Sequence, residues 1–269
     1  VVEIGGRVDI PFSLGVPHLR FGAWLDPDTT PDPNTNSGAP RGAFGFEEVS
    51  SLKPFDLRLF DLGGHDIIVG RVGFTGDLGY EIWFAPGALS EVEQALNTAE
   101  EATGVKGIGY GLTAIQMGRI EAGMIVPGWD TAGTFDDSAD ERTPLELTLG
   151  WNVKLDRGMD FVGENALREQ KAKGARFKMK GIRIDHPAPI EEGTDLLTTV
   201  DGQRIKIGTV PSLIWHAVEE CWIGFASLKA AYVKAETVYV LSDDQAVDGE
   251  LCKLPFIQLD RRTQTPAPR

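Results

Sequence analysis

The sequence predicts an α+β protein in which a layer of strands and helices is followed by a small β-barrel or sandwich. Paired apolar runs after residue 55 precede stretches with helical periodicity. Beyond about residue 173 the pattern changes to short β-like runs separated by turn residues. We therefore expect a loop-rich N-terminal segment over 1–54, an α+β part over 55–172 and a β-barrel part over 173–269.

The first strands of the α+β part form a predicted hairpin. FDLRLFDL, from Phe55, alternates in polarity, GGHD supplies a tight turn, and IIVGRVGF returns as the second strand. YEIWFAP, from Tyr80, predicts a further strand. Stretches rich in Pro, Asp, Thr and Gly at 24–44 and 125–144 predict long loops.

Three helices are predicted between these strands and the barrel. Ser90 and Glu93 fit a capping box at the start of a helix that ends near Thr103. GLTAIQMGRIEAG has an apolar stripe at helical spacing, and ENALREQKAK, over 164–173, is followed by a glycine that suits a helix end. The barrel strands are expected in five later runs, KMKGIRID, QRIKIGTV, CWIGFASL, ETVYVLSD and ELCKLPFIQL.

Composition excludes several classes of partner. The formal net charge is −14, and an acidic chain repels phosphate backbones, so we expect no nucleic-acid partner. No run approaches the ~18 apolar residues of a membrane span, so we expect no membrane partner. Cys221 and Cys252 lie in apolar surroundings without metal-ligand spacing, which favours a reducing compartment. We therefore expect a cytoplasmic protein without a bound metal.

Common catalytic motifs are absent from the sequence. It contains no P-loop, no GxGxxG that follows a strand, and no HExxH, GxSxG or paired CxxC. The four histidines lie far apart along the chain, and no pair of acids indicates general acid–base chemistry. We therefore assign no catalytic residue from the sequence.

The stretch GRVGFTGDLGYEIWF, residues 70–84, permits two interpretations. In the first it is a β-hairpin whose aromatic side chains lie in a core. In the second, Phe74, Glu81 and Trp83 converge on a pocket for a flat heterocycle rich in N–H groups. A carboxylate accepts paired N–H donors and aromatic rings stack on a π-face, which together suit a pterin.

Four motifs in this order resemble the glycine-cleavage T-protein family of folate-dependent aminomethyltransferases, which also contains tetrahydrofolate-dependent demethylases. The motifs are GRVGFTGDLGYEIWF, GRIEAGMIVPGWD, TPLELTLGWNVKLDRGMDFVGENAL, and IGTVPS together with CKLPFI. The resemblance extends over residues 55–257. It implies three small domains in a ring around a folate, with 55–172 binding the folate and 1–54 as a truncated or substituted first domain.

The resemblance also implies roles for individual residues. Glu81 stands at the pterin-binding glutamate, Phe74 stands where the family has Tyr or Trp, and Trp83 stands at a position that lines the folate. The remaining cofactor-binding candidates are Tyr80 and Arg119, and the candidates for the substrate mouth are Trp129 and Asp130. A structural ion pair or helix cap is an open alternative for Arg119.

The implied function is transfer of a methyl or aminomethyl group from a small methylated donor to N5 of tetrahydrofolate. Ile115 and Gln116 occupy places where T-proteins carry an Arg–Asp pair, a departure that favours a demethylase. The alternatives are a non-catalytic folate-binding member of the family and a truncated scaffold without activity. Turnover of a methyl donor separates the first hypothesis from the others, and folate binding separates those two.

Overall fold

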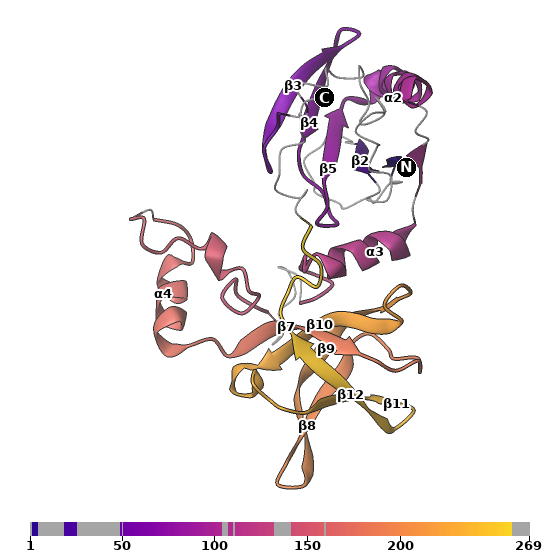
Figure 1. The fold of residues 1–269 in the computed structure, drawn as a ribbon. Coiled ribbons are helices and arrows are strands. Elements are labelled where there is room, and N and C mark those ends of the chain that lie inside the picture. Colours follow the sequence, from indigo (N-terminus) through magenta and orange to yellow (C-terminus); the bar gives the residue numbers. More distant parts are fainter. Residues whose placement is uncertain are drawn as a thin grey trace. The chain divides into compact units, whose positions relative to one another are not determined.

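The structure is a computed structural model that describes residues 2–4, 19–25, 49, 51–103, 107–109, 111–131, 141–158 and 160–259. The chain divides into two compact units (Figure 1). The first runs to Gly118 and also includes the residues after Ile257, and the second runs from Arg119 to Ile257. Most of the predicted 24–44 loop, and 132–140 of the second predicted loop, lie outside the described residues. The boundaries predicted near 54 and 172 stay a prediction.

The first unit contains a mixed sheet with the strand order β3-β4-β5-β2-β1-β6. The strands are β1 (Val2–Ile4), β2 (Leu19–Leu25), β3 (Leu57–Leu62), β4 (His65–Gly70), β5 (Gly79–Phe84) and β6 (Gly107–Ile108). All neighbours are antiparallel except β1 and β6. The predicted hairpin is confirmed as β3 and β4, whose turn places Gly63 and Gly64 at φ +60° and +84°.

Helix α2 (Leu89–Thr103) packs against one face of this sheet. The shared core contains Leu52, Ile67, Val69, Ile82, Phe84, Ala88 and Val92. The predicted capping box at Ser90 was wrong, because a 3-10 turn over Pro86–Ala88 leads into the helix and starts it at Leu89. Proline suits this first turn because it has no N–H to leave unpaired.

Helices α3 (Leu112–Glu121) and α4 (Glu164–Lys173) confirm the other two helix predictions. Gly163 and Gly174 flank α4 with φ of +92° and +91°, and the Gly174 N–H donates to the Gln170 carbonyl at 2.8 Å. Left-handed backbone of this kind favours glycine, which is why the sequence marks both ends of α4 so clearly.

The second unit contains a closed barrel with the order β10-β7-β12-β11-β8-β9, which confirms the predicted C-terminal barrel. Its strands are β7 (Phe177–Ile184), β8 (Thr194–Val200), β9 (Gln203–His216), β10 (Cys221–Lys229), β11 (Val238–Ser242) and β12 (Gln245–Cys252). Four of these strands, β7, β9, β10 and β11, match predicted runs, and β8 was not predicted. The run predicted over 250–259 overlaps β12 only at 250–252, because the strand begins earlier, at Gln245. Strand β8 joins β9 through a turn at Asp201–Gly202, where both residues have positive φ.

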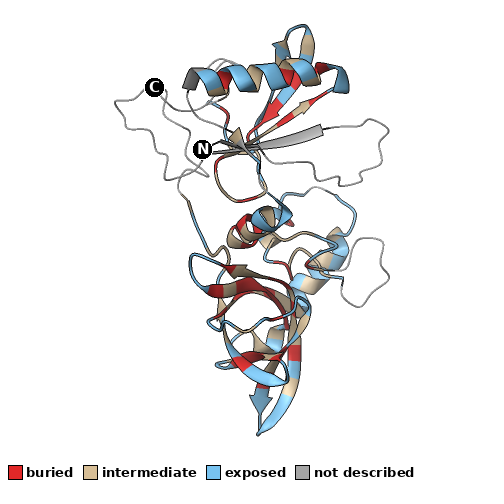
Figure 2. Ribbon diagram, turned by 90° about the vertical axis from the view of Figure 1, so that its right-hand side faces the viewer, coloured by how far each residue is buried: buried red, intermediate tan, exposed pale blue. Residues whose placement is uncertain are grey.

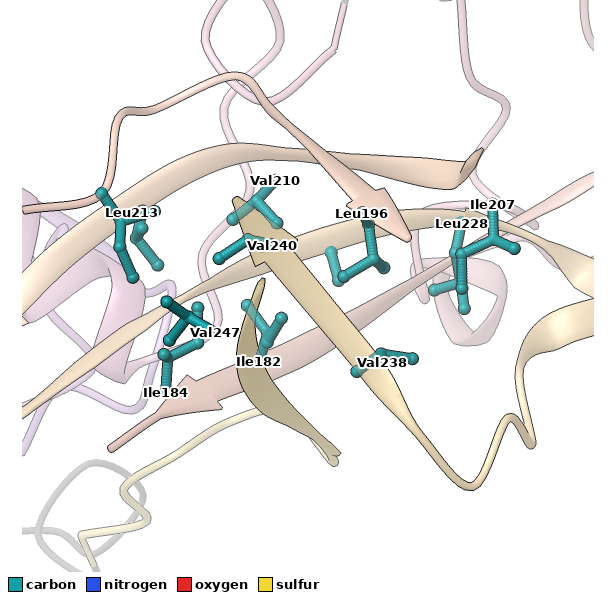
Figure 3. Packing of buried hydrophobic residues seen from close by; sticks show 12 residues of the cluster. Ile182, Ile184, Leu196, Ile207, Val210, Leu213, Leu228, Val238, Val240 and Val247 are labelled. Carbon is teal, nitrogen blue, oxygen red and sulfur yellow. The ribbon is translucent and has the colours of Figure 1, made fainter. Parts of the chain in front are cut away.

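Apolar side chains from all six strands fill the barrel (Figure 3). Figure 2 shows buried residues in red and exposed ones in pale blue on the barrel strands. The labelled residues are Ile182, Ile184, Leu196, Ile207, Val210, Leu213, Leu228, Val238, Val240 and Val247. Successive side chains of a strand point alternately to its two faces, and a closed barrel buries those that point inward. This explains why the short β-like runs fold as a barrel.

Glu146 connects the turn before α4 to the first barrel strand. Its carboxylate accepts the Thr143 N–H at 3.1 Å and the Arg176 Nε–H at 3.3 Å, and its carbonyl accepts the Met179 N–H at 2.9 Å. Burial raises the pKa of the Glu146 carboxyl, but the bonds from Thr143 and Arg176 outweigh it and leave the pKa below its ordinary value of 4.5.

We expect Glu146→Gln to lower the free energy of unfolding at neutral pH by about 1–3 kcal/mol, because the Thr143 and Arg176 donors lose a charged acceptor. Because the folded-state pKa is depressed, the unfolded chain takes up a proton first as pH falls. The difference in the free energy of unfolding between parent and variant is therefore largest above pH 4.5 and decreases below it. Urea unfolding at several pH values measures it, with exposed Glu191→Gln as the control. A difference that grew on acidification would contradict the assignment.

Candidate functional site

Strand β5 places Glu81 and Trp83 on the same face of the sheet. Successive side chains of a strand alternate between faces, so residues 81 and 83 lie together. Ile82 and Phe84 lie on the other face and are buried in the core with α2, at 5% and 3% exposure. Glu81 and Trp83 are themselves half-buried. Two of the predicted pterin-binding residues are therefore neighbours.

Gly70 on β4 makes room for the Trp83 indole. Gly70 is the register partner of Glu81 on the adjacent strand. A Cβ at position 70 would lie 2.6 Å from Trp83 Cζ3 and 2.5 Å from Leu57 Cδ2, so the indole lies directly across this glycine. The sequence did not single out Gly70, although a glycine inside a strand is a signal of close approach.

Phe74 and Tyr80 occupy different surroundings. Phe74 lies half-buried in the turn between β4 and β5. Tyr80 packs against the core cluster on the face opposite Glu81. Burial raises the pKa of the Tyr80 phenol, and the nearby positive charge of Arg71 lowers it in part. The structure does not bring Tyr80 to the face that carries Glu81, and the role of Tyr80 in binding stays a prediction.

Arg119 lies in the second unit and pairs with Asp130. Its Nη1 donates to Asp130 Oδ2 at 2.8 Å and to the Met124 carbonyl at 3.2 Å, and its Nη2 donates to Ser212 Oγ at 2.8 Å. The side chains of Arg119 and Asp130 are 1% and 0% exposed. This is the structural ion pair that the sequence left open for Arg119 beside ligand contact.

Trp129 stands next to this pair and remains accessible. The Arg119 guanidinium lies 5.2 Å from the centre of its indole, while the residue is 40% exposed. The turn that carries it is closed by the Asp130 N–H donating to the Val126 carbonyl at 2.9 Å, with Gly128 at φ +91°. The structure thus brings Arg119, Trp129 and Asp130 together, and their predicted roles toward cofactor and substrate stay predictions.

A hollow of about 520 Å³ on the barrel unit contains none of the predicted site residues. It is lined by Arg183, Asp185, His186, Pro187, Trp215, Ala217, Glu219 and Glu220. Arg183 already donates to Asp185 at 3.0 Å and to Glu219 at 3.2 Å. These charges are thus paired with one another, and we assign the hollow no chemistry.

Metal-binding side chains do not gather in the part of the chain that the structure describes. Within those ranges, no cluster of three or more His, Cys, Asp or Glu could hold a metal ion. The helices of the same described ranges are all too short or too polar to cross a membrane.

Comparison with known proteins points to one family. The family profile described as the GCVT N-terminal domain matches residues 47–157. An aminomethyltransferase from Halothermothrix orenii is 33% identical over 216 residues, which are 78% of this chain and 55% of that protein. A trimethylamine-oxide aldolase from Ruegeria pomeroyi is 35% identical over 211 residues, 78% of this chain and 25% of that protein.

A solved structure agrees with the sequence matches. The crystal structure of the glycine cleavage system aminomethyltransferase T from Bartonella henselae has a TM-score of 0.59 and 23% identity, over 71% of this chain and 50% of that chain. At this identity the likeness establishes the fold alone. The chain spans about half the length of the aminomethyltransferases it matches. The sequence matches show that the chain belongs to the glycine-cleavage T-protein family.

Proposed function

We propose that the protein binds tetrahydrofolate and transfers a one-carbon group to it from a small methylated substrate. The observation that supports this proposal most directly is the pairing of Glu81 and Trp83 on one face of β5, beside Gly70. Related aminomethyltransferases, each matched over about half of its length, support the same reaction class. The alternatives are a folate-binding member without turnover and an inactive scaffold.

The chemistry of the paired residues fits a pterin. The Glu81 carboxylate can accept two N–H groups in parallel, which strengthens and orients the contact. The Trp83 indole provides a flat apolar surface for the ring, and the absence of a Cβ at Gly70 lets this indole lie close to the sheet. Phe74, in the adjoining turn, could add a second aromatic surface but no hydrogen bond.

Bound tetrahydrofolate would supply its N5 atom as the nucleophile that accepts the one-carbon group. The protein's part is then to bind and orient, and holding two reactants in line can lower a barrier by about 7–11 kcal/mol. Glu81 and Trp83 would fix the pterin plane and exclude water from one side of it. Because the folate would supply the nucleophile, an enzyme of this kind needs no nucleophile or acid–base motif in its own sequence.

We further propose that the transferred group is methyl and that the protein is a demethylase. Ile115 and Gln116 replace the Arg–Asp pair of T-proteins, which argues against the glycine-cleavage reaction itself. The relative named as a trimethylamine-oxide aldolase, matched over 25% of its length, supports a reaction other than aminomethyl transfer. Methylated amines, sulfonium compounds and aryl methyl ethers are the donor classes to test.

Anaerobic calorimetric titration with tetrahydrofolate tests the folate site. We expect binding by the parent protein and a loss of about 2–3 kcal/mol in Glu81→Ala, roughly 30- to 150-fold in Kd, because buried pterin donors lose a charged acceptor. Glu81→Gln keeps one acceptor oxygen and should fall between the two. Glu93→Ala removes the same charge from the exposed side of α2 and should bind like the parent.

Each outcome selects one hypothesis. Unchanged affinity in Glu81→Ala would refute the assigned pocket, and the absence of binding in every protein would leave the scaffold alternative. Where binding is present, incubation with the three donor classes and detection of methylated folate separates an enzyme from a folate-binding protein.

A further inference from the structure

Ser212, on barrel strand β9, stands at the centre of the buried polar cluster around Arg119. Its Oγ accepts from Arg119 Nη2 at 2.8 Å and donates its own proton to Asp130 Oδ1. Ser212 is only 3% exposed. A single hydroxyl therefore links the guanidinium to the carboxylate and ties both to the barrel wall.

Asp130 in turn holds the turn that follows α3. Its Oδ2 accepts the Val126 N–H at 2.6 Å as well as Arg119 Nη1. Arg119 also donates to the Met124 carbonyl, and the Gly128 N–H donates to the Thr131 carbonyl at 2.9 Å. The backbone at Met124 and Val126 is thus bonded to one ion pair, and the Gly128–Thr131 bond closes the rest of the turn.

This turn presents Trp129. The indole lies against the Arg119 guanidinium at 5.2 Å, and the same guanidinium lies 5.5 Å from the centre of the Phe225 ring. Phe225 is the register partner of Ser212 on β10. The orientation of the indole consequently depends on the orientation of Arg119, which the Ser212 hydroxyl helps to fix.

We propose that Ser212 is a positioning residue that holds the Trp129 indole in place for ligand contact. The inference rests on the proposed function and deepens it, because it takes Trp129, which the sequence resemblance implies at the substrate mouth, as a contact for the methyl donor. Because Ser212 donates and accepts at once, alanine cannot replace it, whereas threonine retains the hydroxyl. Loss of this hydroxyl leaves a buried guanidinium N–H and a carboxylate oxygen short of a partner.

Fluorine NMR of protein labelled with 5-fluorotryptophan tests the positioning directly. The chain has 6 tryptophans, and the Trp129 resonance is identified by its absence in Trp129→Phe. We expect Ser212→Ala to shift or broaden that resonance and Ser212→Thr to restore it. Ser242→Ala is the matched control, since the Ser242 hydroxyl is buried on β11 and donates to the Pro189 carbonyl at 2.8 Å.

This readout needs no ligand, so it separates failure of the inference from failure of the proposed function. An unchanged Trp129 resonance in Ser212→Ala, or an equal change in Ser212→Thr, would overturn the positioning role. Should the alanine variant not fold, Ser212→Cys retains the volume and carries the same comparison. In turnover assays we expect Ser212→Ala to raise KM for the donor about tenfold, while the Kd for tetrahydrofolate stays unchanged.

Discussion

Replacing Arg119 by methionine is expected to destabilise the barrel unit by about 3–5 kcal/mol. Methionine nearly matches the length of the side chain but leaves the Asp130 carboxylate buried at 0% exposure without its counter-charge. It also removes the donors to Ser212 and Met124. Urea unfolding measures the loss, and the edge-to-face pair of Trp215 and Trp222, 5.6 Å apart, gives a circular-dichroism probe within the barrel.

The double variant Arg119→Met with Asp130→Asn shows whether the loss of stability comes from a buried unpaired charge or from lost packing. Asparagine keeps an oxygen for the Val126 N–H and carries no charge, so the double variant should recover a large part of the stability lost in the single one. A single variant that lost under ~1 kcal/mol would show that the pair contributes no more than a surface salt bridge.

The second large effect is expected at Gly208, where strand β9 passes close to β10. A Cβ on Gly208 would lie 2.1 Å from the Ser227 carbonyl oxygen and 2.7 Å from the Leu228 Cα. These are backbone atoms, so no rotamer change relieves the contact. Gly208→Ala should therefore lower the free energy of unfolding by about 3 kcal/mol, the upper end for overpacking.

Thermal unfolding with the same circular-dichroism probe measures the effect of Gly208→Ala. Gly87→Ala is the control because a methyl group at that position would meet nothing within 4 Å and the φ of Gly87 is not positive. The control should unfold close to the parent. A Gly208→Ala protein as stable as the parent would mean that β9 and β10 can separate without cost at this point.

Local signals explain how much of the fold could be predicted. Helix α4 was predicted over 164–173 because Gly174 follows it, and the structure gives this glycine the positive φ that suits a helix end. The β3–β4 hairpin was predicted from the two glycines of its turn. Strand β8, TDLLTTV, was missed because its threonines and aspartate hide the apolar alternation, although the Asp201–Gly202 turn that follows is a hairpin signal.

Part of the candidate site could be predicted from local sequence signals, and part could not. Glu81 and Trp83 are two residues apart on one strand, so period-two alternation places them together once the strand is recognised. The cluster around Arg119 has no such local signal. Ser212 lies 93 residues from Arg119, and only the packing of the end of α3 against β9 brings its hydroxyl to the guanidinium. Contacts of this kind depend on tertiary structure and leave no spacing in the sequence.

The end of helix α3 has a consequence for exchanging parts between relatives. The Glu121 carbonyl accepts the N–H groups of Phe256 and Ile257, at 2.9 and 3.2 Å, and its side chain contacts His216 Nε2 at 2.7 Å. The last turn of the helix is therefore bonded to the end of β9 and to the segment that follows β12. In a chimera that takes residues 173 onward from a relative, Glu121 would come from one protein and its contact residues from the other. A crossover placed between Gly118 and Arg119 takes Glu121 and its contact residues from the same protein. The suitable crossover point therefore lies inside a helix rather than in a loop.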